Sequence, residues 1–502
     1  MTIFIPQKQL TTEVVGKVAH GLEIVLLDKN SYPAINRAHQ LIKNLANAGK
    51  PIYGVNTGFG ALANILINQN KLGKLQKNLI LSHAVGSGAI FDKEIVRAAM
   101  FLRANMLAKG YSGVSRQLIS TILQMLNKDI VPVVLETGSV GASGDLSPLA
   151  FIAQTLLGIG KVYYQNQIIS ARAALKKAKI KPISLQPKEG LSLINGTEFM
   201  SAIGVLVINK SLYLVKLAEI ASAMSIVALQ AKMSPYDFEL MKLKPHAGQL
   251  LTTRNLQKLL KGYQPNNKNV QDAYSLRCIP QVIGAVRQGI NFAKEIIETE
   301  INAITDNPVV LKKKNQSYQI ISGGNFHGQA ISLAFDNLAI SLTTIGLIAE
   351  RRIYRLLDDK LSNLPAFLVK NPGINSGLMM LQVLASALCA ENKVLANPAS
   401  IHSLPTSAGQ EDFVSMGMTA ANKVRRILAN TLTILALEFI CARQAIALAK
   451  YPLPANLNQF YSIIAHEIPF ITDDRAFQND IDRITKLINE QRFQRLVHNE
   501  IL

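Results

Sequence analysis

Seven short polar stretches interrupt a chain that is otherwise rich in apolar residues. They contain glycine, asparagine and side chains that can transfer protons or bind charged groups. Buried polar groups cost free energy unless they are paired, so seven stretches in one apolar chain predict a shared polar pocket rather than seven unrelated turns. The stretches are residues 53–60 (YGVNTGFG), 82–83 (SH), 138–146 (GSVGASGDL), 195–197 (NGT), 271–277 (QDAYSLR), 323–327 (GGNFH) and 410–412 (QED).

The longest of these stretches continues to residue 148 and reads GSVGASGDLSP. It lies between two apolar runs, residues 130–135 and 149–157. The glycines permit backbone angles that other residues avoid, and Asp145 or Ser147 could cap a following helix whose first turn accommodates Pro148. The local pattern therefore predicts a tight loop that leads into a helix.

Taken together, the motifs resemble those of the histidine and aromatic amino acid ammonia-lyase family. The resemblance depends on ASG followed by DL, with YGVNTGFG upstream and SLRC and GGNF downstream. It covers residues 53–417, with the motifs in unchanged order and at compatible spacing. One motif alone would be weak, but the set is specific to this family.

The resemblance implies a cofactor made from the chain itself, with no external cofactor and no metal. Ala142, Ser143 and Gly144 would cyclise and lose water to give 4-methylidene-imidazol-5-one. Glycine leaves its nitrogen unhindered for attack on the Ala142 carbonyl, and serine supplies the hydroxyl that is lost. Such an electrophile turns the substrate amine into a better leaving group while a base removes a β-proton that is barely acidic.

The resemblance also assigns roles to individual side chains. Tyr53 matches the base that removes the β-proton, and Arg277 matches the arginine that binds the substrate carboxylate in a bidentate manner. Asn195 and Tyr274 match residues that orient the electrophile and the substrate. Gln271 is expected to line the same wall, and Phe326 is expected to pack beside the cofactor ring.

Three positions decide the substrate in the family, and here they are His83, Met379 and Glu411. A neutral imidazole has one N–H donor and one acceptor, so Glu411 can accept while His83 supplies the complementary partner. Phenylalanine-specific relatives usually carry glutamine at the Glu411 position, because burying an unpaired carboxylate against an apolar ring costs free energy. The resemblance thus implies conversion of L-histidine to trans-urocanate and ammonia, the first step of histidine degradation.

Some positions depart from the histidine-specific pattern. Phe413 follows QED where those enzymes usually have histidine, and His402 in IHS is similar to the tyrosine-specific branch. AYSLR with IPQV, and NFHGQ, are also similar to tyrosine ammonia-lyases and 2,3-aminomutases, whereas NSGLM and PTSAGQED are histidine-like. A tyrosine or phenylalanine ammonia-lyase, or a tyrosine 2,3-aminomutase with the same cofactor, therefore remains the alternative.

The elements that position these motifs are mainly α-helical. Apolar residues at three- and four-residue spacing predict long helices over residues 333–361 and 378–395. Short β-like stretches occur at residues 131–135, 161–164, 309–310 and 319–321. Residues 235–269 are predicted to form a linker. Because 502 residues exceed one core, we expect an irregular N-terminal domain (1–200) with the cofactor loop and a helical bundle domain (201–502).

Composition narrows the partners and the compartment. The net charge of +20 comes from scattered lysines, which favours a solvated basic surface over a nucleic-acid site. Charges interrupt the apolar runs at residues 202–231 and 427–449, so these are expected to be core helices and no membrane partner is predicted. Three widely spaced cysteines and no evident signal peptide predict a cytoplasmic protein. The apolar content of 49% would suit the homotetramer that the resemblance implies.

Overall fold

The computed structural model describes residues 2–47, 51–266, 269–313, 317–494, 496–497 and 501. The chain divides into two compact units, and each unit is assembled from three separate segments. The first unit comprises Met1–Asn209, Lys294–Asp336 and Pro398–Asn422, and the second comprises Lys210–Ala293, Asn337–Asn397 and Lys423–Leu502. The first boundary lies close to the expected one at residue 200. However, the units differ from the expected pair of continuous domains because four long helices each contain a boundary.

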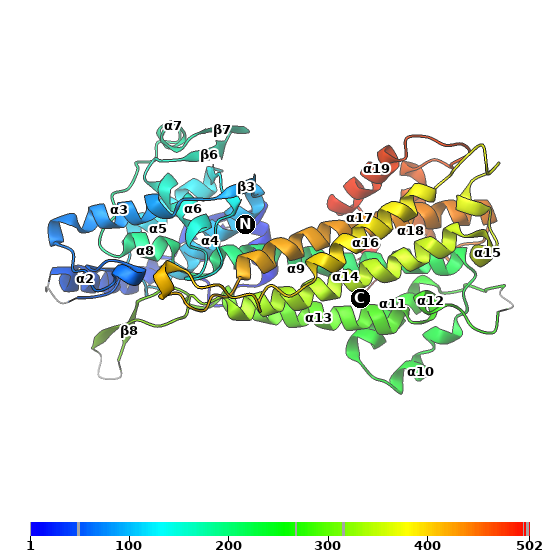
Figure 1. The fold of residues 1–502 in the computed structure, drawn as a ribbon, viewed down its shortest axis with the longest axis horizontal. Helices are drawn as coiled ribbons and strands as arrows, with labels where there is room; N and C mark the ends of the chain where they lie inside the picture. The colour runs from blue at the N-terminus through cyan, green and yellow to red at the C-terminus, as the bar shows by residue number, and fades with distance from the viewer. Residues whose placement is uncertain are drawn as a thin grey trace. The chain divides into compact units, whose positions relative to one another are not determined.

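The first unit contains short helices and small sheets (Figure 1). Its helices are α1 (Thr12–Ala19), α2 (Tyr32–Asn47), α3 (Leu72–His83), α4 (Lys93–Ala108), α5 (Arg116–Asn127), α6 (Leu146–Leu156), α7 (Ala171–Lys177) and α8 (Glu189–Ile194). Short 3-10 turns lie at η1 (Lys29–Ser31), η2 (Gly60–Leu62), η3 (Gln69–Lys71) and η6 (Ser407–Gly409). Helix α4 is the core of this unit because nearly all of its residues are buried, and α1 and α5 pack against it.

Four small sheets complete the described part of the first unit. β1 (Thr2–Ile5) pairs in parallel with β2 (Ile24–Leu27), and the other described strands pair antiparallel. These are β3 (Ser87–Ile90) with β5 (Leu135–Thr137), β4 (Val131–Pro132) with β6 (Lys161–Tyr164) and β7 (Gln167–Ser170), and β8 (Val309–Lys312) with β9 (Tyr318–Ile321). The β-like stretches that the sequence indicates are thus confirmed, although residues 131–135 divide between β4 and β5.

The second unit is a helical bundle built around long apolar helices (Figure 1). It includes most of α9 (Glu198–Ala228), α13 (Ile279–Glu300), α14 (Gln329–Leu357) and α17 (Gly417–Ala449), together with α16 (Met379–Leu395), α18 (Ala455–Glu467) and α19 (Gln478–Asn489). Its short elements are η4 (Ser234–Tyr236), α10 (Phe238–Lys242), α11 (Ala247–Leu259), α12 (Tyr274–Arg277), α15 (Asp359–Ser362) and η5 (Ala366–Leu368). The prediction of a mainly α protein with a long helical bundle is confirmed.

Buried ion pairs join the helices of this bundle. The guanidinium of Arg352 on α14 donates to both carboxylate oxygens of Glu438 on α17, at 2.6 and 2.9 Å. Glu219 on α9 pairs in the same way with Arg287 on α13. Removing one partner of such a pair would leave the other charge buried and uncompensated, so these contacts determine which helices pack against each other.

Helices α9, α14 and α17 are long and apolar enough to cross a membrane by length and composition alone. In the protein, however, 83%, 67% and 78% of their most apolar windows are buried. This burial is what the sequence predicts for core helices, and it accounts for the apolar runs at residues 202–231 and 427–449.

The prediction of a linker at residues 235–269 is wrong. Apart from residues 267–268, which lie outside the described part, this segment contains α10 and the 13-residue helix α11. Pro245 is the proline between these two helices, whereas Gly248 belongs to the first turn of α11. Leu256 and Leu259 on α11 are buried. Packing of those leucines outweighs the breaker residues that made the segment look irregular.

Candidate active site

The ASG triad lies in a tight loop between β5 and α6. Ser139 closes this loop with its side chain: the Oγ donates to the Gly144 carbonyl at 3.2 Å and accepts from the Gly141 N–H at 3.1 Å. Both glycines adopt a φ of +74°, where other residues are disfavoured. The sequence prediction of a glycine-dependent turn is therefore confirmed.

A second loop supports the triad from the other side. Gly144 forms a parallel bridge with Gly196, and the Asp145 N–H donates to the Gly196 carbonyl at 2.7 Å. A Cβ placed on Gly144 would lie 2.1 Å from the Gly196 oxygen, far inside van der Waals contact. The third position of the triad thus tolerates only glycine in this arrangement.

Asp145 does not cap α6, as its sequence position suggested, and neither does Ser147. Asp145 occupies the N-cap position of α6 without a side-chain hydrogen bond to that helix, and its Oδ2 accepts instead from the N–H groups of Phe199 and Met200, both at 2.8 Å. Ser147 donates to the carbonyl of Val85. Asp145 is fully buried, and this burial raises its pKa well above the usual range despite those donors. The aspartate therefore ties the triad loop to the first turn of α9.

A buried ion pair lies beneath the same loops. Arg103 on α4 donates to Glu198 Oε1 at 2.8 Å and to the Asn195 carbonyl at 2.6 Å. Thr305 donates to the same Glu198 oxygen at 2.8 Å. The Asn195 side chain is 2% exposed, and its Oδ1 has no hydrogen-bond partner among the described residues. Asn195 directly precedes Gly196, the residue whose backbone bridges Gly144 of the triad.

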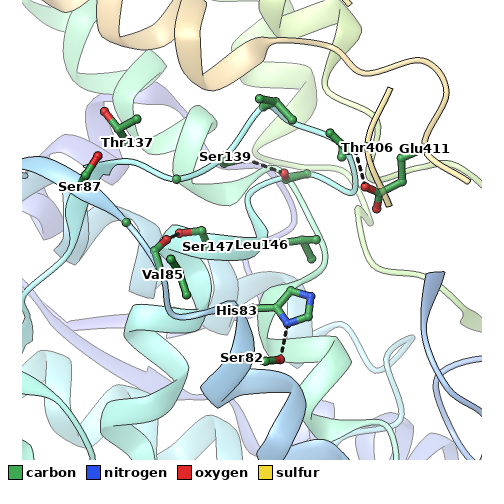
Figure 2. A pocket seen from close by; sticks show the side chains of 15 residues that line it. Ser82, His83, Val85, Ser87, Thr137, Ser139, Leu146, Ser147, Thr406 and Glu411 are labelled. Atoms are coloured by element: carbon green, nitrogen blue, oxygen red, sulfur yellow. Dashed lines mark hydrogen bonds between the residues drawn. The ribbon is translucent and has the colours of Figure 1, made fainter. Parts of the chain in front are cut away.

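Glu411 faces the triad from residues 398–422 of the first unit. Its Oε1 accepts from the Ser143 hydroxyl at 3.2 Å, and its Oε2 accepts from the Thr406 hydroxyl at 2.7 Å. Figure 2 shows the Thr406–Glu411 contact in the wall of a cavity of about 530 Å³. That cavity is lined by Ser82, His83, Val85, Gly86, Ser87, Thr137, Gly138, Ser139, Val140, Ala142, Gly144, Leu146, Ser147, Thr406 and Glu411.

His83 lines the same cavity at the end of α3 (Figure 2). Its Nδ1 lies 2.8 Å from the Leu79 carbonyl and 3.0 Å from the Ser82 hydroxyl. A carbonyl can only accept, so Nδ1 carries the proton and Nε2 of the neutral ring is an acceptor. A hydrogen bond donated by Nε2 to a ligand therefore requires the imidazolium form of His83.

Tyr53 is half-buried in the turn that precedes η2. Its hydroxyl accepts from the Gly60 N–H at 3.5 Å, and its ring meets Phe59 edge to face. Burial raises the pKa of the Tyr53 phenol, the Gly60 donor lowers it, and the negative charge of Glu411 raises it further. The phenol consequently keeps its proton at neutral pH.

Tyr53 and Asn195 are not among the residues that line the cavity, and neither are the remaining predicted site residues. Phe326 is half-buried in the first unit and is not among the residues that line the cavity. In the second unit, Arg277 donates to the Gln271 side chain and its guanidinium lies 5.1 Å from the Tyr274 ring centroid. Met379 begins α16 and is 36% exposed. Arg277, Gln271 and Tyr274 thus form a separate cluster within the second unit.

No group of three or more histidine, cysteine, aspartate or glutamate side chains that could hold a metal ion occurs within the described ranges. All three cysteines are free thiols.

The model of the aromatic amino acid lyase family matches residues 10–466. The chain belongs to this family. It is 43% identical over 494 residues to histidine ammonia-lyase of Myxococcus xanthus, covering 97% of this chain and 96% of that protein. Among solved structures, histidine ammonia-lyase from Trypanosoma cruzi is 37% identical with a TM-score of 0.92, covering 100% of this chain and 96% of the other. Tyrosine aminomutase from Streptomyces globisporus is 34% identical with a TM-score of 0.94, covering 100% and 99%.

Membership of the aromatic amino acid lyases confirms the resemblance drawn from the motifs. Two residues of the site were nevertheless not identified from the sequence. Thr406 lies in the PTSAGQED motif, but only the fold shows that its hydroxyl contacts Glu411. Arg103 interrupts an apolar run of the sequence. A charged residue within such a run is rarely buried without a partner, and this is the signal that could have indicated a buried ion pair.

Proposed function

We propose that this aromatic amino acid lyase converts L-histidine to trans-urocanate and ammonia. The observation that carries the proposal is the Glu411 carboxylate, which lies in the cavity wall 3.2 Å from the Ser143 hydroxyl. A carboxylate there suits a side chain with a ring N–H and penalises an apolar ring. The similarity to proteins named histidine ammonia-lyase supports the same substrate.

The proposed cofactor is 4-methylidene-imidazol-5-one, formed from the triad. The Gly144 nitrogen attacks the Ala142 carbonyl carbon with loss of one water, and Ser143 loses its hydroxyl and α-proton as a second water. The loop fits this closure, because Gly144 and Gly141 both adopt left-handed angles and the unpaired Asn195 oxygen lies next to the partner glycine of Gly144. Once formed, the group supplies an electrophilic carbon that activates the substrate amine for departure.

Helix α6 begins directly after Asp145, so its positive end is directed toward the triad. The first N–H groups of this helix would therefore favour negative charge on a group formed from the triad. The burial of α6, which leaves little competing water, strengthens that effect.

Tyr53 is the proposed general base that removes the β-proton of the substrate. Its raised pKa means that the phenol must first lose a proton, so the rate is expected to increase toward alkaline pH. Glu411 and His83 are proposed to hold the imidazole of the substrate. Glu411 accepts from the N–H of that ring, and the protonated form of His83 donates from its Nε2 to the other nitrogen of that ring.

Arg277 is the proposed ligand of the substrate carboxylate. Gln271 accepts from its guanidinium and Tyr274 lies beneath it, so two contacts already restrict this long side chain. Asn195 and Tyr274 are proposed to orient the substrate, with Phe326 and Met379 forming apolar parts of the wall.

The proposed assembly is a homotetramer in which residues from several copies complete each pocket. The second unit leaves large apolar side chains in solvent, including Val270 and Ile374 at 90% exposure and Tyr274 at 73%. Such exposure is typical of a surface that another subunit covers. The free thiols support a reducing, cytoplasmic location. Neither nucleic acid nor a membrane is a proposed partner.

The alternative is a tyrosine or phenylalanine ammonia-lyase, or a tyrosine 2,3-aminomutase. The TM-score of 0.94 to a tyrosine aminomutase favours it, as do His402 and Phe413 in the sequence. Both of those side chains are exposed, however, and neither is among the residues that line the cavity. The Phe413 ring instead stacks on His327, with centroids 6.0 Å apart. The histidine assignment is therefore the better supported.

Ultraviolet absorbance over time tests the proposal directly. L-histidine, L-tyrosine and L-phenylalanine are compared, because urocanate and the arylacrylates absorb where the amino acids do not, and β-amino acids are sought by chromatography. The proposal expects a signal with L-histidine and none with a Ser143→Ala control. A preference for tyrosine or phenylalanine, or a β-amino acid product, would contradict it.

A further inference from the structure

Thr406 and Glu411 face each other across a tight hairpin that borders the cavity. Their backbones form an antiparallel bridge, with N···O distances of 2.9 Å and 3.3 Å. The intervening turn contains Ser407, Ala408 and Gly409 at φ angles of +51°, +54° and +84°. Three successive left-handed residues are sterically disfavoured and persist only where the surroundings hold them. The hairpin thus has a defined shape.

This hairpin fixes one oxygen of its own carboxylate. The Thr406 hydroxyl donates to Glu411 Oε2 at 2.7 Å, while Oε1 receives the Ser143 hydroxyl at 3.2 Å. Both Thr406 and Glu411 are half-buried and line the cavity. A hydrogen bond to an ionised acceptor is stronger than one between neutral groups, so the 2.7 Å contact restricts rotation of the carboxylate.

We propose that Thr406 is a positioning residue that orients the Glu411 carboxylate toward the side chain of the substrate. This inference rests on the proposed function. The Ser143 hydroxyl is lost when the triad cyclises, so Glu411 Oε1 then loses its donor and can accept the imidazole N–H. Oε2 keeps its donor, because Thr406 belongs to the same hairpin. The threonine thereby selects which carboxylate oxygen meets the substrate.

The experiment compares Thr406→Val with Thr406→Ser in steady-state assays of L-histidine. Valine keeps the shape of threonine but removes the donor, whereas serine keeps the hydroxyl. We expect Thr406→Val to raise the KM for L-histidine by about tenfold with a smaller change in kcat, and Thr406→Ser to remain close to wild type. Intact mass should show both variants lighter than the translated chain by two waters, as for the wild type, which confirms that the triad has matured.

A second readout separates positioning from a general effect on the fold. L-phenylalanine has no ring nitrogen, so as a competing ligand its inhibition constant should change by no more than about twofold in Thr406→Val. Thr299→Val is the matched control: Thr299 is exposed on α13, does not line the cavity and donates to its own helix, so the KM should not change.

Three results would overturn the inference. An unchanged KM for L-histidine in Thr406→Val excludes a role for the hydroxyl, as does an equal defect in Thr406→Ser. Equal losses for L-histidine and L-phenylalanine indicate a structural role alone. If the wild type produces no urocanate, the proposed function itself fails, and that result is visible before any variant is compared.

Discussion

At the scale of single residues, the charge of Glu411 acts on Tyr53 as well as on the substrate side chain that it is proposed to bind. It is one of the groups that raise the pKa of Tyr53, after burial of the phenol itself. The two side chains come from segments more than 300 residues apart, and the hairpin at residues 406–411 packs on the turn at η2 that follows Tyr53. The proposed substrate ligand Glu411 and the proposed general base Tyr53 are therefore electrostatically coupled.

Glu411→Gln tests this coupling through the pH profile. Removing a nearby negative charge favours the ionised phenol, so the pKa of Tyr53 should fall. The rising limb of kcat/KM for L-histidine is expected to move to lower pH, while the maximal value falls because a neutral amide oxygen accepts the imidazole N–H more weakly than a carboxylate does. Glu295→Gln, at an exposed glutamate on α13, is the control and should leave the profile in place. A limb that stays at the wild-type pH in Glu411→Gln would contradict the coupling.

At the scale of elements, Asp145 joins the triad loop to the long helix α9. Its carboxyl accepts from two N–H groups in the first turn of that helix, and it follows Gly144 directly. Helix α9 in turn contributes Glu198 to the ion pair with Arg103 beneath the site. The position of the triad is thus set by the packing of helices as much as by its own glycines.

Asp145→Ala should destabilise the protein, because two buried N–H groups lose their acceptor at a cost of about 1–3 kcal/mol each. Asp145→Asn keeps an accepting oxygen and matches the neutral carboxyl that the raised pKa favours. We therefore expect a clear drop in Tm for Asp145→Ala and a much smaller one for Asp145→Asn, measured by scanning calorimetry at pH 7. The folded pKa lies above the unfolded one, so the stability contributed by the wild-type aspartate should diminish as pH rises. Equal drops in both variants would show that the accepted hydrogen bonds are not what matters.

At the scale of the whole molecule, the predicted catalytic groups divide between the two compact units. Tyr53, His83, Asn195, Glu411 and the triad belong to the first unit. The proposed carboxylate ligand Arg277, with Gln271 and Tyr274, belongs to the second. The exposed apolar side chains of the second unit are consistent with the proposed assembly, in which several copies complete each pocket.

Mixing two inactive variants tests the shared pocket. Tyr53→Phe and Arg277→Lys should each abolish urocanate formation, since one lacks the base and the other the bidentate carboxylate ligand. Co-expressed chains can form tetramers in which one copy supplies Tyr53 and another supplies Arg277, so part of the activity should return. Separately purified variants mixed without exchange are the control. If co-expressed tetramers stay inactive, both residues act from the same chain.

The sequence by itself determined the family of this protein and predicted its reaction centre. The ASG triad and Gly141 are recognisable because the proposed backbone cyclisation and the left-handed angles restrict those positions to a few residue types, and the long helices follow from the spacing of apolar residues. Only the tertiary structure decided where side chains with several possible partners are directed. Asp145 reads as a cap for α6 but binds α9, Phe413 stacks on His327 away from the cavity, and Thr406 holds Glu411. Such contacts join residues distant in the chain or brought together by an unusual turn, and packing rather than local sequence selects among them.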